Sequence, residues 1–170
     1  DLRERNIAGF EALVRWDPQG ATAAELRAME EHLDELGLEV ARARASYERE
    51  QKEAAAIKLL LNQRMAAAEL LQIQIASVVD PAHKMQLEKS LTTLLDMLEQ
   101  MTPEVERETS EAEDARSFLA MLEQTYNDAG AKLKAARGQL ERAERDMQRA
   151  AQQREVAERQ AEVARRTAGL

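Results

Sequence analysis

Apolar residues recur along most of this chain at alternating steps of three and four residues. Two such series follow one another, with polar interruptions only at Glu50 and Arg64 in the first and at Glu108 and Arg154 in the second. The apolar members of the first series are Leu26, Met29, Leu33, Leu36, Val40, Ala43, Tyr47, Ala54, Ile57, Leu61, Ala68, Leu71, Ile75 and Val78. Those of the second are Leu87, Leu91, Leu94, Leu98, Met101, Val105, Ala112, Ala115, Leu119, Leu122, Tyr126, Ala129, Leu133, Ala136, Leu140, Ala143, Met147, Ala150, Ala157, Ala161, Ala164 and Ala168. A period of 3.5 residues maintained this far predicts long helices that each bury one stripe against a partner helix.

Composition restricts the core to this thin stripe. Of 170 residues, 33% are charged and 3% are aromatic, which leaves too few large apolar side chains for a wide globular core.

The absence of cysteine excludes disulfides and thiolate sites and mildly favours a reducing compartment. No apolar run approaches the ~20 residues of a membrane-spanning helix. We therefore expect an all-α, cytoplasmic protein whose membrane contact, if it has one, is peripheral at the inner membrane. Because the chain begins at Asp1 rather than Met, we also expect it to be trimmed from a longer one.

Proline, glycine and capping residues divide the chain into parts. Residues 1–16 form a short amphipathic helix, and residues 17–22 form a linker because its proline and glycine disfavour helix. Thr22 and Glu25 match a capping box, which starts the first long helix near Ala23.

The remaining boundaries define a hairpin with arms of unequal length. Residues 23–140 are predicted to form a long antiparallel two-helix coiled-coil hairpin with its tip near residues 79–82. Asp80 is a good N-cap and Pro81 a good first helical residue, so the second arm opens at about Ala82. The first arm then ends near Val79, and residues 141–170 form an Ala/Arg-rich helical overhang that extends beyond it.

One antiparallel register satisfies all apolar layers, because facing residues have numbers that add to 158 or 159. It pairs Leu26 with Leu133 and Leu33 with Tyr126. Arg64 lies opposite Leu94, near Asp96.

The same register places Glu50 opposite Glu108. Two carboxylates in one layer repel each other and raise a pKa unless Arg49, Lys52 or Arg107 reaches them. The pair is either a metal or acid site or, more simply, a solvated gap that fixes the register.

No motif for catalysis or cofactor binding is present in the sequence. It contains no glycine-rich phosphate loop, no zinc-ligand spacing and no nucleophile elbow. His32 and His83 are the only histidines, and both are predicted to face solvent. We expect a non-enzyme without cofactor or metal.

The charges are distributed unevenly along the sequence. Residues 99–114 contain seven acidic residues and one arginine, whereas residues 132–170 contain ten basic and six acidic residues. This asymmetry favours attraction between copies of the chain, unless the charges simply solvate the helix exterior. The candidate self-association residues are Arg142, Arg145, Arg149, Arg154, Glu104, Glu108 and Glu111. Acidic residues interleave with the arginines and no aromatic residue lies near them, so nucleic acid is an unlikely partner.

From Asp17 onward the order of short motifs resembles the family of phage shock protein A and the vesicle-inducing protein of plastids, which are bacterial relatives of ESCRT-III. The motifs are Asp17-Pro18-Gln19 after a short amphipathic helix, Met29-Glu30-Glu31-His32-Leu33, and the Ala/Arg run Val40-Ala41-Arg42-Ala43-Arg44-Ala45. The likeness covers about residues 5 to 150.

This resemblance implies hairpins that stack side by side into rods, rings or spirals, with membrane contact through the N-terminal helix. The residues it would insert at the lipid headgroups are Ile7, Phe10, Leu13, Val14 and Trp16. The alternative is that they pack on the overhang near Ala143 and Met147.

The leading hypothesis is a non-enzymatic, self-assembling protein of membrane stress response or membrane remodelling. The second hypothesis is a coiled-coil adaptor or scaffold that docks another protein without binding membranes.

Overall fold

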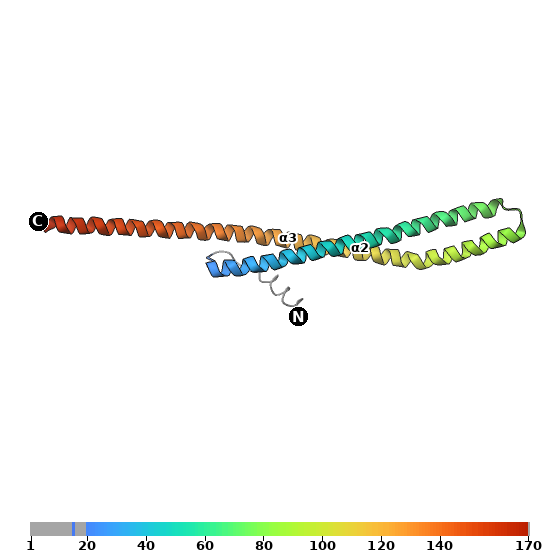
Figure 1. Ribbon diagram of the computed structural model, residues 1–170, viewed down its shortest axis with the longest axis horizontal. Helices are drawn as coiled ribbons and strands as arrows, with labels where there is room; N and C mark the ends of the chain where they lie inside the picture. Colours follow the sequence, from blue (N-terminus) through green and yellow to red (C-terminus); the bar gives the residue numbers. More distant parts are fainter. Residues whose placement is uncertain (1–14, 16–19, 170) are drawn as a thin grey trace. The chain divides into compact units, whose positions relative to one another are not determined.

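The computed structural model describes residue 15 and residues 20–169, and in this part of the chain it is entirely helical (Figure 1). Its two helices are α2 (Ala23–Ser77) and α3 (Pro81–Ala168). The fold consists of two compact units, one formed by α2 up to Leu38 with α3 from Gln124, and the other by Glu39–Glu123. The N-terminal helix predicted for residues 1–16 lies outside the described residues, apart from Arg15.

The predicted capping residues define where both helices begin. At the start of α2 the Glu25 backbone N–H donates to Thr22 Oγ1 at 3.2 Å, as the capping box predicts. At the start of α3 the Ala82 N–H donates to Asp80 Oδ1 at 3.3 Å. Pro81 is the first residue of α3, where its missing N–H costs nothing. Only Val78, Val79 and Asp80 separate the two helices.

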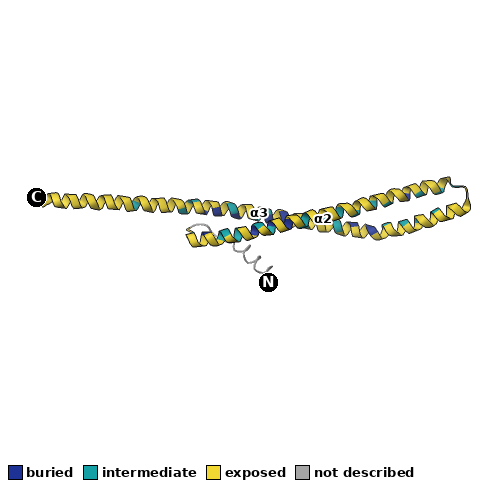
Figure 2. Ribbon diagram, in the orientation of Figure 1, coloured by how far each residue is buried: buried dark blue, intermediate teal, exposed yellow. Residues whose placement is uncertain are grey.

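Burial in the second unit follows the predicted series, whereas Tyr126, Ala143 and Met147 of the first unit are exposed. Between residues 54 and 78 every member of the first series is buried or half-buried, and every residue between them is exposed. The same alternation runs along α3 through residue 122. The buried stripe is therefore one side chain wide, as composition predicts. Figure 2 shows its residues as short buried or intermediate bands among exposed ones along the helices.

In the first unit the core is a small cluster of Leu26, Leu133 and Ala136. Leu26 and Leu133 thus belong to one cluster, as the register predicts. An ion pair between Glu30 and Arg137 joins the two helices beside this cluster.

Two long side chains make contacts that the predicted register does not include. Tyr126 lies against Gly37, since a Cβ added at Gly37 would lie 3.2 Å from Tyr126 Cε2. In the second unit Arg64 Nη1 donates to Met101 Sδ at 2.7 Å. Helical side chains lean toward the N-terminus of their own helix, and between antiparallel helices this moves each contact along the partner.

The end of α3 is covered by no other described residue. Residues 141–149 and 151–169 are all exposed, and Ala150 is half-buried. No helix in the described part of the chain is long and apolar enough to cross a membrane.

Gly37 and Gly138, which both lie inside helices, make a matched pair for testing the tyrosine contact. A glycine inside a helix costs about 1 kcal/mol relative to alanine, and no atom lies within 4 Å of a Cβ added at Gly138. We expect Gly138→Ala to raise the free energy of unfolding by about 1 kcal/mol. Gly37→Ala should gain less than half as much, because its Cβ displaces Tyr126. Urea unfolding followed by circular dichroism measures both, and equal gains would contradict the contact.

Candidate functional site

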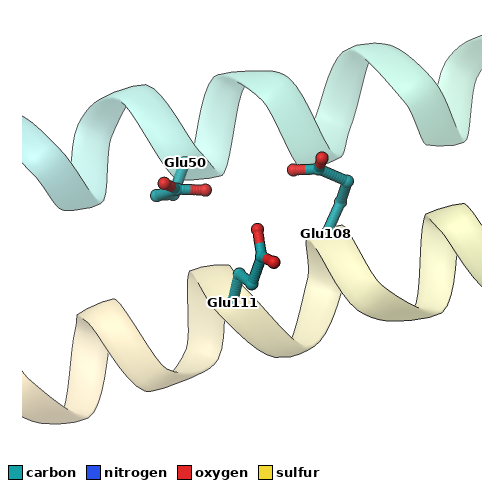
Figure 3. A group of neighbouring side chains, drawn as sticks. All are labelled: Glu50, Glu108 and Glu111. Atoms are coloured by element: carbon teal, nitrogen blue, oxygen red, sulfur yellow. The ribbon is translucent and has the colours of Figure 1, made fainter.

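Three carboxylates cluster at one point along the apolar stripe of the second unit. Glu50 comes from α2, and Glu108 and Glu111 come from adjacent turns of α3. One oxygen of each lies within 4.8 Å of the others, and the side chains point toward one another between the helices (Figure 3). We call these residues the carboxylate layer; the predicted pairing of Glu50 with Glu108 is confirmed.

The carboxylate layer is only partly neutralised by a cation. Arg107 Nη2 lies 3.9 Å from Glu108 Oε1, and Arg107 Nε lies 3.9 Å from Glu111 Oε1. The second oxygens of Glu50 and Glu108 are buried and accept no hydrogen bond from any described residue. Of the three cations that could neutralise the layer, the structure places Arg107 beside it.

Burial raises the pKa of the Glu108 carboxyl above its ordinary value of 4.5. The negative charges of Glu111, Glu53 and Glu50 raise this pKa further, and Arg107 lowers it. Desolvation and like charges both disfavour the ionised form, so Glu108 resists ionisation more than an isolated glutamate does.

The carboxylate layer can relieve this repulsion by binding a proton or a hard cation. Carboxylate oxygens are the ligands that calcium and magnesium ions prefer. Like the buried polar residues that set coiled-coil register, a charged layer also disfavours any slip that would place an apolar residue against it.

The three acidic residues predicted to take part in self-association differ in their exposure to solvent. Glu104 is exposed and lies outside the carboxylate layer, whereas the side chain of Glu108 is 20% exposed and belongs to it. Glu111 is exposed, but its carboxylate also belongs to the layer and lies 3.9 Å from Arg107. Of the three, Glu104 is therefore the most accessible to another molecule.

The overhang (residues 141–168) carries its ion pairs on one side. Arg159 Nη2 lies 2.9 Å from Glu155 Oε1, and Arg166 Nη2 lies 2.7 Å from Glu162 Oε1. These pairs lie away from the apolar stripe, because their members occupy positions between its alternating steps.

The candidate arginines of the overhang are exposed. Arg145 Nε donates to the backbone oxygen of Glu141 at 3.4 Å. Arg142, Arg149 and Arg154 form no ion pair with any described residue. Their charge is thus available for an acidic partner.

The two histidines are not equivalent. His83 is exposed, as predicted. His32 is half-buried, and its Nδ1 lies 3.9 Å from Glu35 Oε2. Neither histidine has the neighbours of a catalytic or metal site in the described structure.

The sequence interpretation missed a second apolar face on α2. Leu59, Leu70 and Ile73 are exposed on the side of the helix opposite the buried stripe. The available signal was the scarcity of charge between residues 55 and 77, where only Lys58, Arg64 and Glu69 are charged.

Comparison of the chain with protein-family models, with curated proteins and with solved structures gives no match. The membrane-contact residues Ile7, Phe10, Leu13, Val14 and Trp16 lie outside the described residues.

Replacing Glu108 tests whether the carboxylate layer destabilises the fold at neutral pH. Because the folded protein holds the Glu108 proton more tightly than the unfolded chain, the contribution of Glu108 to stability is most favourable below pH 4.5 and falls as pH rises through the raised pKa. The destabilisation caused by Glu108 is therefore larger at pH 7 than at pH 4. We therefore expect Glu108→Gln to raise the melting temperature by a few degrees at pH 7 and to have little effect at pH 4.

The matched control for this prediction is Glu106→Gln, which removes the same charge from an exposed position. Melting curves from circular dichroism at both pH values compare the two variants. Equal changes in both would show that general charge repulsion, and not the carboxylate layer, is responsible.

Proposed function

We propose that this chain is a non-enzymatic, self-assembling coiled-coil hairpin that acts in membrane remodelling or in the response to membrane stress. The observation that carries the proposal is the overhang, a helical segment whose apolar stripe continues without a covering partner among the described residues. Isolated helices are marginally stable in water, and burying such a stripe stabilises them. A partner molecule is the simplest source of that burial.

A coiled-coil arrangement of the two arms is part of the proposal. Its support is the alternation of buried and exposed residues at steps of three and four along both helices. Apolar a and d positions that repeat in this way are typical of helices that interlock their side chains.

Charge gives the overhang a preferred partner. Arg142, Arg149 and Arg154 are exposed without an ion pair to any described residue, and Glu104 is exposed in the acidic segment (residues 99–114). We infer that the acidic segment of one copy attracts the overhang of the next. Attraction between exposed charges weakens as salt shortens the screening length, from ~10 Å at 0.1 M to ~3 Å at 1 M.

Membrane contact is assigned to the N-terminal segment on its sequence alone. If this segment is helical, its spacing would place Ile7, Phe10, Leu13, Val14 and Trp16 on one apolar face, with Arg3, Arg5 and Arg15 beside it. A helix of this pattern lies in the headgroup region, and its arginines favour anionic lipid.

The self-assembly proposal predicts large, salt-sensitive particles. Light scattering should decrease as salt rises, and Arg149→Glu with Arg154→Glu should lower it several-fold at low salt. The matched control is Arg159→Glu with Arg166→Glu, which makes the same charge change on the ion-paired side of the helix. A wild-type monomer that is unchanged from low to high salt would contradict self-assembly.

The membrane proposal predicts co-sedimentation with anionic vesicles. Phe10→Glu and Trp16→Glu should abolish it because each places a charge on the inserting face. Arg159→Glu serves as the control and should leave it unchanged. If the intact protein assembles but stays in the supernatant, the membrane role is wrong and the adaptor or scaffold function replaces it.

A further inference from the structure

A second apolar face runs along α2 opposite the stripe that packs on α3. Leu59, Ala66, Leu70 and Ile73 follow one another at steps of seven, four and three, so they share one side of the helix. The exposed fractions of Leu59, Leu70 and Ile73 are 59%, 56% and 66%. We call this side the outer face of α2. Apolar side chains this large and this regularly spaced are typical of a helix that contacts a further partner.

The outer face is bordered by two charges of opposite sign. Lys58 and Glu69 lie along the same edge of it, and neither forms an ion pair with a described residue. They are eleven residues apart, or ~16 Å along the helix, which is too far for them to pair within one chain. Arg64, the third charge in this stretch, is directed to Met101 of α3.

We propose that the outer face of α2 binds the outer face of α2 in a second copy of this chain, with the two helices antiparallel. In this arrangement Leu59 of each copy packs against Leu70 of the other. Lys58 of each copy then lies beside Glu69 of the other, and the twofold symmetry forms this ion pair twice.

The charge pattern and the spacing of the outer face favour an antiparallel second copy of this chain as its partner. In an antiparallel pair the same edge of each helix meets its counterpart, so an edge that carries one lysine and one glutamate is complementary to itself. In a parallel pair that edge meets the opposite one, which carries only uncharged residues such as Gln63 and Gln74. The centre of the face at Ala66 is small, which lets the two backbones approach closely.

The size of the face determines how strong the contact is. Residues 55–77 extend ~35 Å along a helix ~10 Å across, so each copy offers roughly 350 Å² in projection. The two copies together fall below the 1,200–2,000 Å² typical of stable complexes. A single contact of this kind is transient, and repetition between many copies would make it persist.

The proposed contact is separate from the proposed overhang contact. It uses neither the overhang, nor the acidic segment, nor the N-terminal residues. Either contact can therefore fail while the other stands, and reversing Arg149 and Arg154 should leave the outer-face contact unchanged.

Site-specific cross-linking tests the antiparallel geometry, because the chain contains no native cysteine. In the proposed register Ala66 lies within about one helical turn of the same residue in the second copy, whereas Ser77 lies ~37 Å from its counterpart. Ala66→Cys should therefore give dimers with a short bismaleimide, and Ser77→Cys should give several-fold fewer. Equal yields would indicate parallel pairing, and no dimer from either would contradict any contact through this face.

Charge reversal in the Ala66→Cys background tests the partner residues. Lys58→Glu should lower the dimer yield several-fold, and adding Glu69→Lys should restore it. Lys89→Glu on α3 is the matched control and should leave the yield unchanged. Failure of the double variant to restore cross-linking would overturn the register.

A last pair of variants tests whether apolar contact with a second copy, and not with another partner, covers the outer face. Leu70→Asp should abolish cross-linking of Ala66→Cys, whereas Leu38→Asp, at a residue 60% exposed elsewhere on α2, should not. Circular dichroism checks that both variants remain helical. If anionic vesicles, and not a second copy, protect the Ala66→Cys thiol from a water-soluble maleimide, the face binds lipid and the proposal is wrong.

Discussion

The structure depends on one narrow stripe of apolar contact between α2 and α3. Each helix contributes one side chain per layer, and the layers alternate at three and four residues. Among the described residues no second layer covers the outer sides of the helices, so even Leu26 and Ala136 remain 4% and 3% exposed. Stability therefore accumulates from many small contributions along the length, and no single central cluster dominates.

Polar residues inside this stripe are tolerated according to the reach of their side chains. Arg64 has a long apolar stem, and its guanidinium reaches Met101 while keeping access to water. Glu50 and Glu108 are shorter, and each turns a carboxylate toward the other without a hydrogen-bond donor for one oxygen. A polar interruption of the stripe therefore costs little folding free energy at Arg64 and more at Glu50 and Glu108.

A stripe this narrow also leaves much of the surface free for association. The overhang and the outer face of α2 are both exposed, but they differ in character. The overhang combines small apolar residues with arginines, of which Arg142, Arg149 and Arg154 form no ion pair with a described residue; this favours a salt-sensitive contact with an acidic surface. The outer face combines large apolar residues with little charge, and burial of apolar area would dominate its association. Two contacts of different chemistry would allow a chain of this kind to assemble in more than one direction.

The sequence by itself determined the helices, their capped starts at Thr22 and Asp80, the buried stripe and the pairing of Glu50 with Glu108. These features depend on local propensity and on a period of 3.5 residues, which can be read without knowing the partner helix. Only the tertiary structure decided that Tyr126 lies on Gly37 and that Arg64 reaches Met101. Those contacts depend on the direction in which a side chain leaves its helix, and residue numbers alone do not encode that direction. The tertiary structure also determines that Leu59, Leu70 and Ile73 are exposed. Apolar residues in a sequence do not reveal which side of a helix its neighbour will cover.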